Sequence, residues 1–231
     1  MTHLTRCPLN PARARRLTGS PQRLHAAVAA AFPPPPSGQA TGHRVLWRLD
    51  ESGHQPTLLI LSPTPPDLTH LIEQAGWPRL ATADAPGWET RPYAPLLDHL
   101  HTGMRLRFRL TANPTRALHR PGRRGLRTAL TAPADQIQWL LDRAAPAGFT
   151  VPVDERISPA GHHVRVSATR ALRFPRTTDS GARRDVHLHT ATYDGLLDVT
   201  DPDVLRRTLT DGIGHGKAYG CGLLTLARFA A

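Results

Sequence analysis

The sequence predicts an α+β fold with two similar domains in tandem, and three observations indicate it. Segments with the period of strands and of helices follow one another in the order β-α-β-β-α-β, and this order occurs twice. The 231 residues are enough for two domains of about 100 residues each. Met104–Thr111 alternates strictly between apolar and polar positions, so the second set of strands begins there. We therefore expect two ferredoxin-like βαββαβ domains, over residues 1–95 and 96–231.

The first domain is predicted around one well-marked helix. Ser20-Pro21 is a good helix start, because serine caps an N-terminus and proline fits the first turn. This helix should run to about Phe32 and bury Leu24, Ala27, Val28 and Ala31. The other expected elements are strands at Leu4–Leu9, Arg44–Leu49, Thr57–Leu61 and Thr90–Tyr93, a turn at Glu51–His54 and a helix at Asp67–Ala75.

The second domain begins with the alternating strand. Leu106, Phe108 and Leu110 should face the core, and an arginine ladder should face outward. The remaining expected elements are a basic hairpin or loop at His119–Arg127, a helix at Thr131–Ala144 with Ile137, Leu140 and Leu141 inward, strands at Phe149–Val153, Val164–Phe174 and Asp185–Val199, a turn-rich tip at Pro175–Arg184, a helix at Pro202–Leu209 and a strand at Gly222–Arg228.

The charge of the chain points to a polyanionic partner. The 29 basic residues exceed the 18 acidic ones, which gives a net charge of +11 and a sequence pI of about 11.2. Nucleic acid is the commonest such partner, although a merely basic soluble protein stays open. The apolar runs are too short to span a membrane, and no signal peptide is expected. Cys7 and Cys221 are isolated, which is typical of reduced thiols in the cytoplasm.

A glycine-rich segment, Asp211–Gly222, is the most unusual stretch. It contains the only lysine of the chain, Lys217. Backbone N–H groups in such a loop suit anionic oxygens, but a turn that only packs a helix onto a strand is the open alternative. A P-loop is excluded, because Ala218 replaces the required Ser/Thr and the order is helix–loop–strand. The glycines are Gly212, Gly214, Gly216, Gly220 and Gly222.

Two motifs resemble the CasE family, the CRISPR-associated endoribonucleases of type I-E systems. They are Arg105–Pro114 and Gly212–Leu226, and the segments Leu24-His25, Gln136–Leu140 and Gly195–Val199 fall in the family's order. The resemblance covers nearly the whole chain. It implies two ferredoxin-like domains that bind the stem-loop of CRISPR repeat RNA and cut at its base without a metal ion. The products would be a 2′,3′-cyclic phosphate and a 5′-hydroxyl, and the protein would stay on the hairpin with the other Cascade subunits.

The resemblance places the catalytic histidine at His25. Histidine suits acid or base chemistry because its pKa of about 6.5 lies near neutrality. Many family members carry a tyrosine three residues earlier, where this chain has Gln22, and glutamine cannot transfer a proton. Lys217 could stabilise the developing charge, and Tyr219 and His215 are candidate proton-transfer groups. A non-catalytic hairpin-binding subunit of the same fold therefore remains the alternative function.

RNA binding is expected mainly from arginines near the turn-rich tip, which resembles a hairpin that the family lays along the RNA stem. Arginine forks suit the phosphates of A-form RNA, and a solvated charge run is the alternative. His162, His163, His187 and His189 lack metal-ligand spacing, so neither a metal nor a cofactor is expected. The expected RNA-binding residues are Gln22, Arg173, Arg176, Arg183, Arg184, Lys217, Gly212, Gly214, Gly216 and Gly220.

Overall fold

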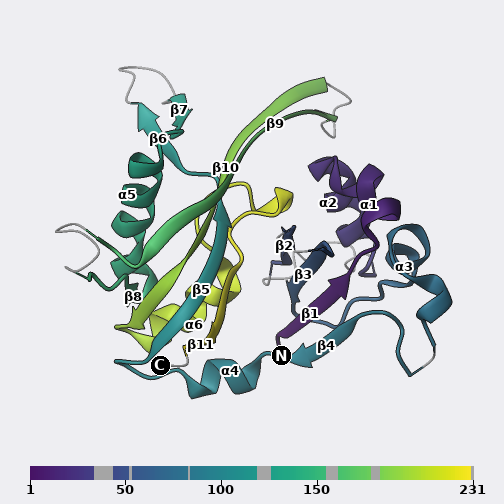
Figure 1. Cartoon of the computed structure of the whole chain (residues 1–231), viewed down its shortest axis with the longest axis horizontal. Coiled ribbons are helices and arrows are strands. Elements are labelled where there is room, and N and C mark those ends of the chain that lie inside the picture. Colours follow the sequence, from purple (N-terminus) through teal and green to yellow (C-terminus); the bar gives the residue numbers. More distant parts are fainter. Residues whose placement is uncertain are drawn as a thin grey trace. The chain divides into compact units, whose positions relative to one another are not determined.

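The structure is a computed structural model, and it describes residues 1–33, 44–51, 54–82, 84–118, 126–154, 161–177 and 183–229. The chain forms two compact units (Figure 1). Unit 1 comprises Met1–His99 and Lys217–Gly220, and unit 2 comprises Leu100–Gly216 and Cys221–Ala231. The division thus falls four residues after the expected one, and the middle of the glycine-rich segment groups with the first unit instead of the second.

Unit 1 contains a four-stranded sheet in the order β2-β3-β1-β4. All neighbouring strands of this sheet are antiparallel. This strand order and this antiparallel pairing are those of a ferredoxin-like domain, so the expected fold is confirmed. Pro8 lies at the end of β1, beyond the last residue that pairs with β4, as a residue without an N–H should. The strands are β1 (His3–Pro8), β2 (Leu46–Asp50), β3 (Thr57–Ser62) and β4 (Glu89–Pro92).

Two helices of unit 1, at Pro11–Thr18 and Ala94–His99, were not expected from the sequence. The basic cluster Arg13–Arg16 belongs to α1 (Pro11–Thr18). The Asn10 side chain caps it, because its oxygen accepts from the backbone N–H groups of Ala12 and Arg13 at 3.0 and 3.2 Å. The other helical segments are α2 (Pro21–Ala29), α3 (Thr69–Ala75), α4 (Ala94–His99) and the short 3₁₀ turns η1 (Pro78–Leu80) and η3 (Lys217–Tyr219).

Helix α2 begins as predicted but ends earlier. The Ser20 hydroxyl accepts a hydrogen bond from the N–H of Arg23. The helix ends at Ala29, because Ala31 and Phe32 bond to carbonyls three residues earlier in a tighter turn. The expected face of the helix is buried, and it packs in one core cluster with Trp47 of β2. Of the four side chains expected on this face, Leu24, Val28 and Ala31 are buried and Ala27 is half-buried.

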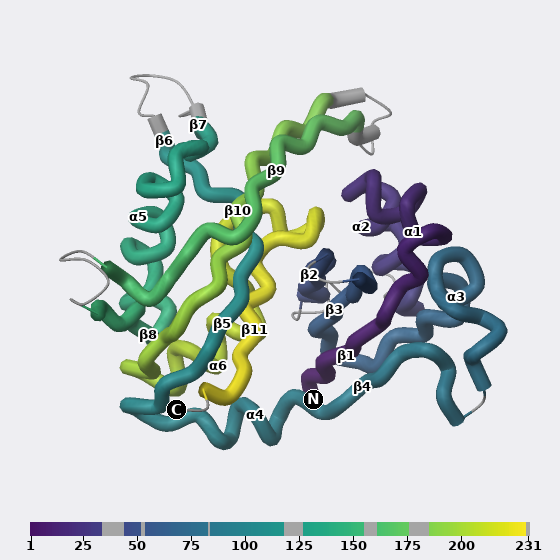
Figure 2. Tube along the Cα trace, viewed as in Figure 1, coloured from purple at the N-terminus to yellow at the C-terminus, as the bar shows by residue number. Residues whose placement is uncertain are grey.

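Unit 2 repeats the arrangement with a longer hairpin. Its sheet has the order β11-β5-β10-β8, and β9 pairs with β10, as the long ribbon in Figure 2 shows. This is again the ferredoxin-like order, with β8 and β9 together in the place of the second strand. The elements are β5 (Arg105–Ala112), β6 (Thr115–Leu118), β7 (Leu126–Ala129), α5 (Pro133–Ala144), η2 (Ala145–Ala147), β8 (Phe149–Thr150), β9 (Val164–Thr177), β10 (Arg183–Val199), α6 (Pro202–Asp211) and β11 (Leu224–Arg228).

Arginines of β5 form ion pairs with the neighbouring strand β10. Leu106, Phe108 and Leu110 are buried as predicted. Two of the arginines on the other face bind aspartates of β10, Arg105 to Asp198 at 2.7 Å and Arg109 to Asp194 at 2.6 Å. The hydrogen bond from Arg105 lowers the pKa of the Asp198 carboxyl, so this pair stays ionised at neutral pH. These arginines therefore join two strands.

Helix α5 buries a different set of side chains from the expected one. Leu140 is buried, but Ile137 and Leu141 are only half-buried. Trp139 and Gln136 take their place, because the Trp139 ring stacks on Tyr193, whose hydroxyl donates to the Gln136 carbonyl oxygen at 3.0 Å. The turn at 51–54, the loop at 119–127 and the tip at 175–184 lie partly outside the described residues. In the part of the chain that is described, no helix is both long and apolar enough to cross a membrane.

The two cysteines should be unreactive in the folded protein. Both are buried as free thiols, and burial raises the pKa of Cys7 and of Cys221 to about 12. Because the thiolate is the nucleophile, neither should react with Ellman's reagent at about pH 8, and both should react once urea unfolds the chain. Absorbance of the released thiolate measures this, and one equivalent released by the native protein would contradict the burial.

Candidate active site

His25 lies on a firmly anchored helix. Its neighbour on α2, Leu24, and Val28 one turn further on are each 2 % exposed and belong to the core cluster of unit 1. His25 itself is half-buried, at the flank of this buried stripe, as its sequence position predicted. The core therefore fixes the backbone that carries the imidazole, while the ring remains partly accessible.

Tyr219 lies next to His25, although it comes from the far end of the chain. The two ring centroids are 5.9 Å apart, and the ring planes meet edge to face at 64°. Both residues belong to unit 1, because Lys217–Gly220 groups with that unit. Tyr219, one of the two proton-transfer candidates named from the sequence, is thus in ring contact with His25.

Gly220 fixes the turn that carries Tyr219. Its φ is +80°, a region that side chains other than glycine rarely adopt. A Cβ atom at this position would lie 2.6 Å from Cζ3 of Trp47. Trp47 is only 4 % exposed and belongs to the same core cluster as Leu24 and Val28. The segment with Tyr219 is therefore positioned against an indole that belongs to the same core cluster as the helix with His25.

The other glycines serve the turn between α6 and β11. The N–H of Gly212 donates to the Thr208 carbonyl oxygen, and that of Gly222 donates to the Thr111 carbonyl oxygen. A Cβ at Gly214 would lie 3.0 Å from the Trp139 ring. Because the amide of Gly212 is used inside the fold, it is not a donor to an anion. Anion binding by the rest of the loop stays a prediction.

Gln22 and Lys217 flank the two rings in sequence. Gln22 precedes His25 by three residues on α2, so the two lie on the same face of the helix. The Gln22 Oε1 atom is buried and has no hydrogen-bond partner among the described residues. Lys217 is half-buried and begins the 3₁₀ turn that ends at Tyr219. The only lysine of the chain thus lies in the same short turn as the ring that contacts His25.

The arginines expected to bind RNA fall on the β9–β10 ribbon. Arg176 is directly opposite Arg184, and Arg183 is opposite Thr177, so both strands bring arginine to the same end of the ribbon. The side chains of Arg176, Arg183 and Arg184 lie outside the described part of the structure. Arg173 contacts Asp185 at 2.8 Å, but the two side chains are 71 % and 45 % exposed. Exposed pairs of this kind contribute little to stability.

The paired histidines have local partners. His163 Nε2 lies 3.6 Å from an oxygen of Asp154, and His162 Nδ1 lies 3.4 Å from the Val151 carbonyl oxygen. His187 is exposed and His189 is half-buried on β10. Among the residues that the structure describes, no three or more His, Cys, Asp or Glu side chains form a group that could hold a metal ion.

The sequence and the fold match a known class of proteins. The family described as CRISPR associated protein matches residues 2–228. The CRISPR-associated endoribonuclease Cse3 of Thermus thermophilus is 33 % identical over 229 residues, which cover 97 % of this chain and 99 % of the relative. The Escherichia coli K12 protein named CRISPR system Cascade subunit CasE is 29 % identical, over 70 % of this chain and 76 % of the relative.

A solved structure of Thermus thermophilus Cse3, bound to an RNA representing a pre-cleavage complex, is also similar. Its TM-score is 0.74 at 31 % identity, and the match covers 98 % of this chain and 99 % of that one. The chain therefore belongs to the CasE family of CRISPR-associated proteins.

Proposed function

We propose that this protein is a metal-independent endoribonuclease that cuts precursor CRISPR RNA at the base of the repeat stem-loop. It then keeps the hairpin product as a subunit of Cascade. The observation that carries the proposal is the contact of the His25 and Tyr219 rings at 5.9 Å. An endoribonuclease relative over nearly the whole chain and a Cascade-subunit relative support it. The cytoplasm is the proposed location, where free thiols such as Cys7 and Cys221 stay reduced.

The two rings supply the two proton transfers that the reaction needs. In the proposed step, His25 takes the proton of the ribose 2′-hydroxyl, and the 2′-oxygen forms a bond to the adjacent phosphorus. The bond from phosphorus to the 5′-oxygen breaks, and Tyr219 donates its hydroxyl proton to that oxygen. The products are a 2′,3′-cyclic phosphate and a 5′-hydroxyl. Tyrosine suits the acid role because its hydroxyl carries a donatable proton at neutral pH.

The remaining residues bind and orient the RNA in this proposal. Lys217 shares its turn with Tyr219 and stabilises the charge that develops on the phosphate. The unpartnered amide oxygen of Gln22 can accept a hydrogen bond from a ribose hydroxyl, so Gln22 binds without transferring a proton. Gly214, Gly216 and Gly220 shape the turn that presents Lys217. The hairpin stem contacts Arg173, Arg176, Arg183 and Arg184 of the β9–β10 ribbon, whose forked side chains suit phosphates.

A cleavage assay tests the proposal. The purified protein should cut a labelled repeat hairpin once in the presence of EDTA, and the upstream fragment should end in a cyclic phosphate. The same hairpin with a 2′-deoxy sugar at the scissile position should remain intact, because the nucleophile is missing. Tight binding without cutting would contradict the nuclease. It would favour the alternative that Gln22 suggests, a subunit that holds the hairpin without cutting it.

A further inference from the structure

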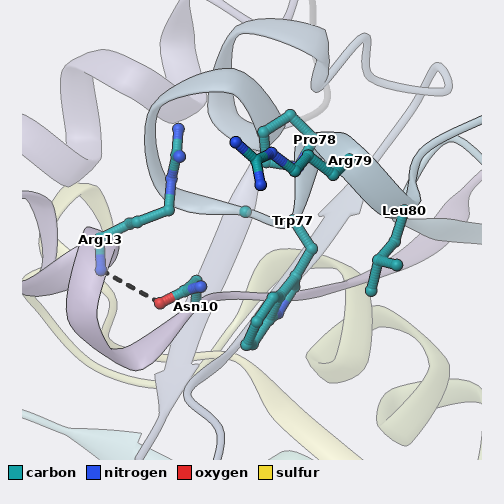
Figure 3. A pocket seen from close by; sticks show the side chains of 7 residues that line it. Asn10, Arg13, Trp77, Pro78, Arg79 and Leu80 are labelled. Atoms are coloured by element: carbon teal, nitrogen blue, oxygen red, sulfur yellow. Dashed lines mark hydrogen bonds between the residues drawn. The ribbon is translucent and has the colours of Figure 1, made fainter.

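Unit 1 contains a second candidate site, away from His25. A pocket of about 290 Å³ lies where the chain leaves α3 (Figure 3). Trp77, Arg13, Arg79, Asn10 and Leu80 line it. None of the residues that line it is acidic. The proposed cleavage reaction uses none of these side chains.

The pocket exposes a large aromatic ring. Trp77 is 41 % exposed and Leu80 is 74 % exposed, so two of the large exposed apolar side chains of the described chain line this one pocket. Exposed apolar side chains gathered in one place mark binding sites more often than isolated ones do. Gly76 lets the chain turn here, because a Cβ atom at that position would lie 2.7 Å from Cα of Ile72. The tight turn and Pro78 hold the indole at the surface.

The arginines of this pocket are not neutralised by acids. In the described part of the chain, neither Arg13 nor Arg79 forms an ion pair, whereas Arg48, Arg105 and Arg109 each bind an aspartate. Arg13 donates one N–H to the backbone carbonyl oxygen of Glu73, which holds the side chain in place. The rest of its guanidinium can still donate to an anion, because arginine has five N–H donors.

The aromatic and cationic groups occupy different ends of the pocket. In Figure 3 the side chains of Arg13 and Arg79 extend toward the same side, and the indole of Trp77 points the other way, toward Asn10. A nucleotide likewise carries its base and its phosphate at different ends. Single-stranded nucleic acids are commonly bound in this way, by stacking on aromatic rings beside positive charge.

A larger groove adjoins the pocket and shares Arg13 with it. The groove has a volume of about 710 Å³, and Arg16 and Arg23 also line it, together with Glu73. Arg23 and His25 are two residues apart on α2, which places them about 200° apart around the helix. The groove therefore lies on the side of α2 away from His25 and is separate from the proposed cleavage site.

We propose that the Trp77 pocket binds an unpaired nucleotide of the RNA that flanks the repeat hairpin. The base stacks on Trp77, and Arg13 and Arg79 hold a phosphate. The strand continues past Arg16 and Arg23 along the adjoining groove. This inference rests on the proposed function in one respect, namely that the ligand of the pocket is RNA.

The test measures affinity for three labelled RNAs by fluorescence anisotropy. They are an unstructured RNA octamer, the repeat hairpin without flanks, and the hairpin with a single-stranded flank. Trp77→Ala should bind the octamer about 5- to 150-fold more weakly, because a base loses its stacking partner, and Trp77→Phe should restore most of the affinity. Arg79→Ala should reduce the slope of log affinity against log salt by about 0.7, the value for one phosphate of a single strand.

Arg15→Ala is the matched control. Arg15 is an exposed arginine on α1 that lines neither the pocket nor the groove, so this variant loses the same charge elsewhere. It should change the affinity for the octamer less than Arg79→Ala does. All four variants should bind and cut the flankless hairpin as the wild type does, because the pocket is separate from His25.

Wild-type affinity of Trp77→Ala for the octamer and for the flanked hairpin would overturn the proposal. A loss of affinity in Arg15→Ala equal to that in Arg79→Ala would also overturn it, because it would indicate a general effect of charge. Unchanged RNA binding with lost association to other Cascade subunits would assign the pocket to a protein partner. A protein that binds the octamer through Trp77 but cuts no hairpin would overturn the proposed function and leave the pocket standing.

Discussion

Replacement of His25 by alanine is expected to lower the rate of RNA cutting by about 10²- to 10⁴-fold, which is the usual contribution of a positioned acid or base. The fold should tolerate the change, because His25 lies at the flank of α2 and the buried side chains beside it, Leu24 and Val28, remain. Alanine also favours the helix. Affinity for the hairpin should be nearly unchanged, since the proposed stem contacts are on the β9–β10 ribbon of unit 2.

The measurement is the single-turnover rate in EDTA with protein in excess over hairpin, so that product retention does not limit it. His54→Ala is the control, because His54 is an exposed histidine of the same unit. Tyr219→Phe keeps the ring against His25 and removes only the hydroxyl, and it should also slow cutting strongly. The double variant should cut at nearly the rate of the slower single variant, because the two groups act in the same step. A His25→Ala protein that cuts at the wild-type rate would remove His25 from the mechanism.

Local sequence signals predicted most of the fold but missed the helices α1 and α4. Ser20-Pro21 marked the start of α2, and the same kind of signal, Asn10-Pro11, also begins α1. The ion pairs of the β5 ladder had no local signal, because Asp194 and Asp198 are 85 and 93 residues away from their arginines. Only the pairing of β5 with β10 brings them together.

The candidate site was also predictable only in part, because it too depends on contacts between residues far apart in the sequence. His25 follows from a family resemblance, and its flank position follows from the helical period of α2. Its contact with Tyr219 depends on Gly220 fitting against Trp47, and no sequence pattern shows that approach. The glycine-rich run suggested a cradle for anions, whereas the amides of Gly212 and Gly222 are bonded inside the fold. The Trp77 pocket was not predicted, although an aromatic residue beside Pro78 and Arg79 was a visible signal.

The second large effect is expected from Gly220→Ala. A methyl group there meets two obstacles, the φ of +80° and the Trp47 ring 2.6 Å away. The backbone conformation alone costs about 1–2 kcal/mol for a residue with a Cβ, and overpacking against a buried ring adds about 1–3 kcal/mol. Because the indole is fixed in the core, the turn itself must shift, and Tyr219 moves with it. A displacement of about 1 Å in a catalytic group can slow a reaction about 10²-fold.

Gly103→Ala separates these two causes. Gly103 has nearly the same φ, +83°, but no atom lies within 4 Å of a Cβ built there. The Gly103→Ala protein should therefore lose only the cost of the backbone conformation, about 1–2 kcal/mol in the free energy of unfolding. It should cut at the wild-type rate. Urea denaturation and single-turnover cutting, both at a temperature where all three proteins are folded, make the comparison. If Gly220→Ala loses no more stability than Gly103→Ala and still cuts normally, the contact with Trp47 does not position Tyr219. If it cuts slowly while binding the hairpin normally, the placement of Tyr219 beside His25 is what the glycine provides.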